Sequence, residues 1–172
     1  MPADLAQLYD AHAQALYAFA LNLTRREADA CDVLHDIFRQ LAAHPDLLAR
    51  VRDERAFLLR LAHNRAIDLL RRQTTREKIR DTLARDDDLL FAPAASPDES
   101  AFRRALAAAL AELPPEQRAV AHLKLWENLT FAQIAETLDL SPNTAASRYR
   151  YALDKLQTRL RPLYNEIQNP WT

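Results

Sequence analysis

The stretch LDLSPNTAASRYRYAL, residues 138–153, has the pattern of a tight turn followed by an amphipathic helix. Ser141 is a favourable residue for capping a helix N-terminus, and Pro142 is favourable in the first helical position. Beyond them, small and apolar residues follow one face at helical spacing, at Ala145, Tyr149, Ala152 and Leu156. The sequence therefore predicts a well-defined helix start and a packed side.

A shorter helix is expected just before this turn. Thr130 and Gln133 have the spacing of a capping box, and Asp139 occupies the turn itself. Two short helices joined by a three-residue turn form a helix-turn-helix. We expect the apolar side of the second helix to pack on Ile134, Ala135 and Leu138.

The other side of the second helix has a basic character. Between residues 143 and 161 there are five basic side chains against Asp154 alone, a local surplus that suits DNA phosphates. The basic residues are Arg148, Arg150, Lys155, Arg159 and Arg161. Small residues such as Ala146 leave few side chains for bidentate base contacts. A helical hairpin with a merely solvated charged face remains the alternative.

The composition limits the possible functions. The 172 residues contain no glycine, so glycine-dependent phosphate loops are excluded, and most positive-φ positions should fall on Asn or Asp, such as Asn128 and Asp139. The net charge of −1 means that nucleic-acid binding must come from local patches. The single cysteine suits a reducing cytoplasm. We expect no signal peptide and no membrane insertion.

The N-terminal part predicts three helices and the whole chain an all-α fold. Apolar residues recur at helical spacing over residues 5–23, and TRRE, residues 24–27, has a capping-box pattern that should start a second helix. That helix should stop near His44 and Pro45. A third begins near Asp53 and runs through Arg72. Helices are also expected on both sides of Pro114 and Pro115, and a last one from Pro142 to about Leu160.

The organisation is two small helical domains joined by an acidic linker. Residues 73–100 carry four basic against seven acidic side chains and include two prolines, which is typical of a tether. We therefore expect a first domain over residues 1–75, a linker over 76–100 and a second domain over 101–165. Residues 166–172 are expected to form a C-terminal tail.

These motifs together resemble a known family. The stretch LPPEQRAVAHLKLWENLTFAQIAETLDLSPNTAASRYRYALDKLQTRL resembles region 4 of bacterial sigma factors of the extracytoplasmic-function group. DACDVLHDIFRQL resembles region 2.2, and AFLLRLAHNRAIDLLRR resembles regions 2.3 and 2.4. The matches lie in family order with the linker between them. The resemblance implies a bacterial sigma factor with a region 2-like bundle and a region 4-like helix-turn-helix.

The resemblance also implies roles for residues of the first domain. Asp32 and Asp36 match the acidic positions of region 2.2, and with Arg39 and Gln40 they would bind the β′ clamp helices of RNA polymerase. Arg60, Asn64 and Arg71 lie along one polar stripe and would contact the −10 element and its non-template bases. The loop over residues 44–55 would take part. Asp29 is expected on a solvated acidic face, and Asp68 in an ion pair within its own helix.

In the second domain the resemblance implies contacts with the −35 element. The Thr-x-x-Ser-Arg pattern falls on Thr144, Ser147 and Arg148, and the expected contact set is completed by Asn143, Arg150 and Tyr151. Asn128, Asp139 and Asn143 stand where the family usually has glycine, so the promoter sequence does not transfer from relatives. The implied partners are the polymerase core, including its β flap, promoter DNA and an anti-sigma factor.

Two other classes of function are alternatives to a sigma factor. A helix-turn-helix regulator of another type, such as a response-regulator output module, would bind duplex DNA without polymerase. Such a regulator would carry a receiver domain with alternating strands, and only helices are expected here. Cys31 and His35 lie four residues apart, a spacing that suits a pair of metal ligands or an activated thiol. Two ligands do not make a zinc site, so we expect no catalysis, no metal and no cofactor.

Overall fold

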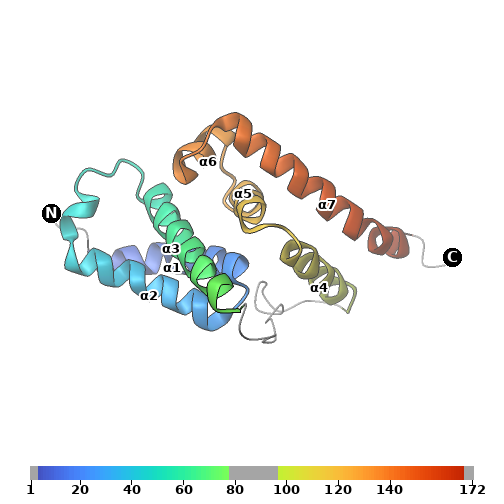
Figure 1. Cartoon of the computed structure of the whole chain (residues 1–172), viewed down its shortest axis with the longest axis horizontal. Coiled ribbons are helices and arrows are strands. Elements are labelled where there is room, and N and C mark those ends of the chain that lie inside the picture. Colours follow the sequence, from blue (N-terminus) through green and yellow to red (C-terminus); the bar gives the residue numbers. More distant parts are fainter. Residues whose placement is uncertain (1–3, 78–96, 169–172) are drawn as a thin grey trace.

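The chain is built from helices throughout its described part. The computed structural model describes residues 4–77 and 97–168, and every regular element among them is helical (Figure 1). The first bundle comprises α1 (Leu5–Thr24), α2 (Glu27–Ala43), the 3-10 helix η1 (Pro45–Leu48) and α3 (Glu54–Glu77). The second comprises α4 (Pro97–Ala111), α5 (Pro115–Leu125), α6 (Phe131–Leu138) and α7 (Pro142–Gln168). The all-α prediction is confirmed.

Helix starts follow the capping chemistry of the sequence. Asp4 Oδ1 accepts the Ala6 amide at 3.0 Å, and Asp53 Oδ1 accepts the Ala56 amide at 2.9 Å at the start of α3. At α6 both halves of the Thr130–Gln133 capping box are present. These side chains satisfy amide groups that have no partner within the helix. The predicted starts of α3 and α6 are therefore confirmed.

The predicted capping box at residues 24–27 is wrong. Thr24 ends α1, and its hydroxyl donates to the Ala20 carbonyl at 2.9 Å instead of capping α2. The N-cap of α2 is Arg26, which makes no side-chain capping bond. The chain reverses at Arg25, which has φ 61° and donates its amide to Leu21 at 2.8 Å. Asn128 and Asp139 take positive φ as expected. Arg25 also takes positive φ, so a residue with a long side chain occupies a helix end where glycine is usual.

The last helix is longer than predicted. It continues to Gln168 with Pro162 inside, whereas the sequence suggested an end near Leu160. An internal proline costs about 3 kcal/mol because it removes one backbone bond and crowds the preceding turn. Beyond the proline, Tyr164 lines the same apolar groove as Phe102 of α4.

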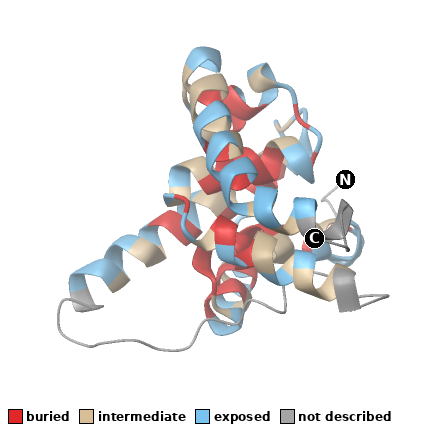
Figure 2. Cartoon of the chain, turned by 90° about the vertical axis from the view of Figure 1, so that its right-hand side faces the viewer, coloured by how far each residue is buried: buried red, intermediate tan, exposed pale blue. Residues whose placement is uncertain are grey.

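The two bundles share a continuous apolar core. Phe19, Ile37 and Leu58 are fully buried at the centre of the first bundle, and Val120 and Ile134 of the second belong to the same cluster. Figure 2 shows the buried residues gathered along the middle of the molecule, where the bundles meet. A smaller cluster lies between α4, α5 and α7. The bundles therefore pack directly on each other.

Candidate functional surfaces

An acidic groove lies between α2 and α3. It has a volume of about 300 Å³, and Asp32, Asp36 and Asp68 line it together with Arg65 and Arg72. Asp32 is exposed, while Asp36 pairs with Arg39 at 2.6 Å, one turn along the same helix. The predicted set Asp32, Asp36, Arg39 and Gln40 thus lies on one side of α2. Its geometry is partly fixed by contacts within the chain.

Two neighbours of this groove differ from expectation. Asp29 is buried, not solvated: its Oδ2 accepts a hydrogen bond from Gln73 Nε2 at 2.8 Å and lies 3.7 Å from Arg26 Nε. It therefore ties the start of α2 to α3. Asp68 makes no ion pair within the described residues. Arg65, one of its expected partners, donates to Gln40 Oε1 at 2.9 Å across the two helices.

The polar stripe of α3 is exposed along its length. Arg60, Asn64 and Arg71 all face solvent, as the helical spacing predicts. The Arg60 guanidinium lies 5.8 Å from the centre of the Phe57 ring, and Asn64 Oδ1 lies 3.4 Å from His63 Nδ1. Flat side chains and an amide suit stacking and hydrogen bonding to unpaired bases. The stripe therefore has the chemistry for holding single-stranded DNA.

Burial lowers the pKa of His63, which is next to Asn64. The hydrogen bond with Asn64 and the charge of Glu116 oppose this shift, whereas the charges of Arg148 and Arg71 add to it. Glu116 belongs to α5 and Arg148 to α7. The imidazole beside the α3 stripe therefore lies within the electrostatic reach of the second bundle.

A second groove lies where α6 faces the start of α3. It has a volume of about 370 Å³ and is lined by Arg50, Arg52 and Arg60 on one side and by Gln133 and Glu136 on the other. The basic residues before α3 were predicted only as part of the loop over residues 44–55. Their cluster next to Arg60 extends the positive part of the α3 stripe.

The start of α7 has the geometry expected of a recognition helix. Ser141 Oγ accepts the Thr144 amide at 3.1 Å, and the two hydroxyl oxygens are 2.8 Å apart. Asn143, Arg150 and Tyr151 are exposed, whereas Thr144, Ser147 and Arg148 are half-buried. The Arg150 guanidinium lies 5.6 Å from the Tyr151 ring centre. The six predicted residues are thus within three turns of one helix, but only half of them face open solvent.

The apolar side of α7 packs as predicted near its start and differently further along. Ala145 is in the same buried cluster as Ile134, and the rings of Tyr149 and Phe131 lie 5.6 Å apart. Ala152 and Leu156 instead pack with Leu110, Leu113 and Ala121 of α4 and α5. The short α6 ends too early to cover them, so two other helices do.

An apolar groove lies on the second bundle, and the sequence reading did not find it. It has a volume of about 820 Å³, and Phe102, Leu125, Leu160 and Tyr164 are among its lining residues. Phe102, Leu125 and Tyr164 are large apolar side chains left exposed. Exposed clusters of this kind mark sites of protein–protein contact. The signal in the sequence was the apolar spacing of residues 153–164, which continues past Pro162.

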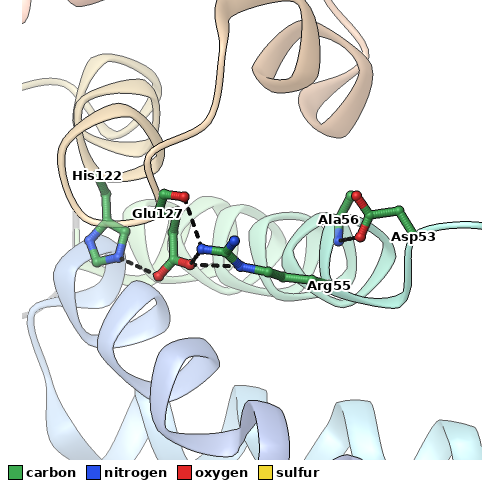
Figure 3. Close-up of polar contacts among 5 residues, drawn as sticks. All are labelled: Asp53, Arg55, Ala56, His122 and Glu127. Atoms are coloured by element: carbon green, nitrogen blue, oxygen red, sulfur yellow. Dashed lines mark hydrogen bonds and ion pairs between the residues drawn. The ribbon is translucent and has the colours of Figure 1, made fainter.

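A group of polar side chains joins the two bundles, and the sequence did not predict it either. Arg55, at the start of α3, donates from Nε to Glu127 Oε2 at 3.1 Å and from Nη2 to the Glu127 carbonyl at 2.9 Å (Figure 3). The other carboxylate oxygen lies 3.8 Å from His122 Nε2. Asn22 Nδ2 is 3.1 Å from His122 Nδ1. No motif predicts the contacts between the bundles, because they join residues 72 and 100 positions apart.

Within the described residues, no group of three or more His, Cys, Asp or Glu side chains is placed to hold a metal ion. Cys31 is a free, half-buried thiol. None of the described helices is long and apolar enough to cross a membrane.

Both halves of the chain match models of one protein family. The model described as Sigma-70 region 2 matches residues 8–76, and the one described as Sigma-70, region 4 matches residues 103–156. The first match includes the acidic groove between α2 and α3 and the polar stripe of α3. The second match includes the residues predicted to contact the −35 element. A helix-turn-helix regulator of another type is not favoured, because the first bundle also has its counterpart in this family.

Similar proteins support the same assignment. The chain is 35% identical over 160 residues to the ECF RNA polymerase sigma factor SigL of Mycobacterium tuberculosis, covering 91% of this chain and 88% of that protein. It is 27% identical to the ECF RNA polymerase sigma factor SigX of Bacillus subtilis, covering 94% and 86%. The RNA polymerase sigma factor CarQ of Myxococcus xanthus is 29% identical, with 93% and 91% covered.

The fold has a solved counterpart. The sigma factor RpoE, in a co-crystal structure with the anti-sigma factor NepR from Bartonella quintana, aligns with a TM-score of 0.76 at 23% identity. The alignment covers 92% of this chain and 97% of that one, so both bundles have equivalents there. The family matches and the 35% identity to SigL show that the chain belongs to the sigma-70 family, as an alternative RNA polymerase sigma factor of the extracytoplasmic-function group.

Proposed function

We propose that this sigma factor binds core RNA polymerase through the acidic side of α2, contacts the −10 element through α3 and contacts the −35 element through α7. The observation that carries the proposal is the match of both family models, in order, to the two bundles that hold these three polar faces. We divide the chain into a region 2-like domain (1–75), a linker (76–100), a region 4-like domain (101–165) and a tail (166–172).

The α2 groove suits a basic protein surface. Asp32 is exposed at its edge, and Asp36 is oriented by Arg39, so the pair offers carboxylates in a defined arrangement. The hydrogen bond from Arg65 to Gln40 holds α2 and α3 together beside it. Electrostatic complementarity of this kind chiefly selects the partner and speeds its encounter. The β′ clamp helices of the polymerase are the proposed partner.

The α3 stripe suits a melted −10 element. A base taken out of the duplex needs stacking surfaces and a group that reads its hydrogen-bonding edge. Arg60 with Phe57 offers flat surfaces, and the Asn64 amide can both donate and accept. Arg71 would meet a backbone phosphate further along the stripe. Strand opening is therefore proposed to occur against this helix.

The α7 face suits duplex DNA at the −35 element. The Ser141 cap at its start supports this, because it fixes the first turn of α7, from which Asn143, Thr144 and Ser147 would meet base edges in the major groove. Arg148, Arg150 and Tyr151 supply positive charge and an aromatic edge beside them. Because the side chain at Ala146 is small, readout would rely on phosphates and groove shape as well as on base edges.

Further partners follow from the remaining surfaces. The apolar groove of α4, α5 and α7 is the proposed seat of the polymerase β flap, since exposed Phe102, Leu125 and Tyr164 offer an apolar face. An anti-sigma factor is a proposed regulator by similarity to the RpoE–NepR complex. The protein would act in the cytoplasm, without catalysis and without a cofactor.

The experiment that tests this function is run-off transcription. Core polymerase is incubated with a library of promoter fragments, with and without the protein, and the transcripts are sequenced. The proposal requires new start sites that appear only when both proteins are present and share a −10 and a −35 sequence. Binding to duplex DNA that is equally specific without core, with no new transcripts, would instead support a regulator of another type.

A further inference from the structure

We propose that the free chain forms a dimer in which two copies pack their apolar grooves together, with the C-terminal halves of α7 antiparallel. Asp154 of each copy pairs with Arg161 of the other. The dimer covers the groove that is the proposed seat of the β flap, so the chain binds core polymerase as a monomer. This effect on core binding rests on the proposed function of the groove, but the dimer itself does not.

The groove is a large apolar surface that lies open. It has a volume of about 820 Å³, and Figure 1 shows α4 beside the C-terminal half of α7, the two helices that supply most of its lining. Of its side chains, Phe102 is 37% exposed, Leu125 47% and Tyr164 58%. Apolar side chains this exposed favour association, because covering them releases the water in contact with them.

Two opposite charges lie in the same groove. Asp154 and Arg161 both line it, and both are exposed. Within the described residues, neither side chain takes part in an ion pair. They are seven positions apart, which is two helical turns and roughly 10.5 Å along the axis of α7. A partner that carries the same two charges in reverse order pairs with both of them.

A second copy of the chain, turned end for end, offers that reversed order. Most homodimers have twofold symmetry, in which one surface patch faces its own copy. A twofold axis that crosses α7 midway between the two charges brings position 154 of each copy opposite position 161 of the other. The dimer therefore contains two identical Asp154–Arg161 pairs. The overall charge of −1 leaves little repulsion between the copies.

The apolar residues follow the same symmetry. Leu153, Leu160 and Tyr164 also line the groove, and at about 100° per residue they lie on one edge of this face of α7, with the two charges on the other edge. In an antiparallel pair related by that axis, like edges meet, so the apolar edges cover each other. In a parallel pair each charged edge would lie against an apolar edge. The charges therefore select the antiparallel arrangement.

The dimer is expected to be weak. The patch involves parts of three helices, and interfaces smaller than about 1,200 Å² belong mostly to transient complexes, so we expect a Kd on the order of 10 µM. Exposed ion pairs add little affinity, but like charges brought together across an interface are strongly unfavourable. Charge reversal is therefore a more sensitive probe of the arrangement than removal of the charges.

The dimer is tested by sedimentation velocity of the full chain between about 1 and 200 µM, a range around the expected Kd. A reductant is present throughout, because Cys31 is a free thiol. Asp154→Arg places two Arg–Arg contacts in each dimer, and Arg161→Asp places two Asp–Asp contacts there. Each variant alone should weaken the dimer by at least about 30-fold.

An equal mixture of the two variants is the decisive sample. In a mixed dimer, Arg at position 154 of one copy faces Asp at position 161 of the other, and the second contact is the original Asp154–Arg161 pair. The mixture should therefore dimerise within about threefold of the parent affinity, although each variant alone does not. A variant that had simply failed to fold could not be rescued by mixing.

Lys155→Asp is the matched control. Lys155 is exposed on α7 next to Asp154, but it does not line the groove. The substitution makes the same change of charge as Arg161→Asp on another side of the helix. It should leave the dimer Kd within about twofold of the parent, as for most surface substitutions. An equal loss in the control would mean that overall charge, and not the groove, determines association.

Three results would overturn the proposal. They are a parent chain that stays monomeric over the whole range, single variants that dimerise like the parent, and a mixture that stays monomeric. Dimerisation of the parent and of the mixture, with loss in both single variants, supports it.

Core polymerase separates this dimer from the proposed function. Added core should dissolve the dimer and form complexes that contain one copy of the chain. If core binds the chain with two copies, the dimer stands and the groove is not the seat of the β flap. If the parent chain binds core but never dimerises, the proposed function stands and the dimer is wrong.

Discussion

The acidic side of α2 and the basic side of α7 are both exposed helical faces, but they are organised differently. On α2, Asp36 is paired with Arg39 at 2.6 Å, and Gln40 receives a hydrogen bond from Arg65 of the next helix. On α7, Arg150 makes no hydrogen bond or ion pair within the described residues, and its guanidinium lies 5.6 Å from the centre of the Tyr151 ring. The α2 face is held in place by its surroundings, whereas Arg150 on the α7 face extends into solvent.

The difference matches the two proposed partners. A protein surface is recognised by shape and by fixed charge positions, so pre-ordered carboxylates lose little conformational entropy on binding. A phosphate backbone presents repeated charges, so mobile arginines can find partners in several registers. The α2 face should therefore be sensitive to the identity of each side chain. The α7 face should respond mainly to the number of positive charges.

The largest effect is expected at α2. Asp32→Arg with Asp36→Arg should lower the affinity for core polymerase by at least about 100-fold, because like charges brought together across an interface cost several kcal/mol. Fluorescence titration of labelled protein with core measures it. The helical content should not change, since Asp32 is exposed, Asp36 is half-buried and neither belongs to the apolar core.

A charge control belongs with this variant. Asp10→Arg reverses an exposed carboxylate on α1 that lies outside the groove residues. Its affinity for core should stay within about twofold of the parent, as for most surface substitutions. Equal losses for Asp10 and the α2 pair would mean that overall charge, not the groove, determines binding.

The α3 stripe should show an intermediate effect. Asn64→Ala should weaken strand opening by about 1–3 kcal/mol, because the lost amide no longer bonds to an extruded base. Permanganate reactivity of thymines in the −10 element reports opening, and gel shift of the closed complex reports initial binding. Normal reactivity at limiting protein would remove Asn64 from this role. The exposed Gln7→Ala on α1 is a suitable control.

A smaller effect is expected for one arginine of α7. Arg150→Ala should lower affinity for a −35 duplex on the order of fivefold and reduce the salt slope by about one unit, if the contact is to phosphate. A loss confined to promoters with one particular base would indicate a guanine contact. Salt titrations of the full chain, in the presence of core, measure both. Arg159→Ala is the matched control, because Arg159 pairs with Glu112 within the protein.

Local signals in the sequence predicted local structure well. The Thr130–Gln133 capping box, the positive φ of Asn128 and Asp139, and the Ser141 cap all depend on residues within a few positions. TRRE failed, although it has the same pattern, because Thr24 lies at the end of a helix and bonds back to Ala20. A capping motif cannot tell whether its first residue is already inside a helix.

Contacts between distant residues were the part that the sequence could not provide. Asp29 was expected on the surface, but its bond to Gln73 depends on how α3 crosses α2. The Arg55–Glu127 contact and the groove around Tyr164 depend in the same way on the packing of whole helices. The site residues themselves were taken from family resemblance. Their contacts with polymerase and DNA remain predictions.

The smallest effect is a gain on the basic face. Ala146 is half-buried on the side of α7 that also carries Asn143 and Arg150. Ala146→Lys adds a charge whose long stem can extend to solvent, so we expect about two- to threefold tighter binding to the −35 duplex and a salt slope steeper by about one unit. The melting temperature should change little, because the added atoms enter no packed core.

The same substitution also sharpens the contrast with α2. A gain in affinity that disappears at high salt would show that the affinity of α7 for DNA depends on its number of positive charges, as proposed. Ala146→Gln is the neutral control of similar length, and it should leave both affinity and slope unchanged. If Ala146→Gln binds as tightly as Ala146→Lys, hydrogen bonding to base edges drives the gain. The basic face of α7 would then be organised for direct readout, and it would no longer differ from the α2 face in depending on the number of its charges.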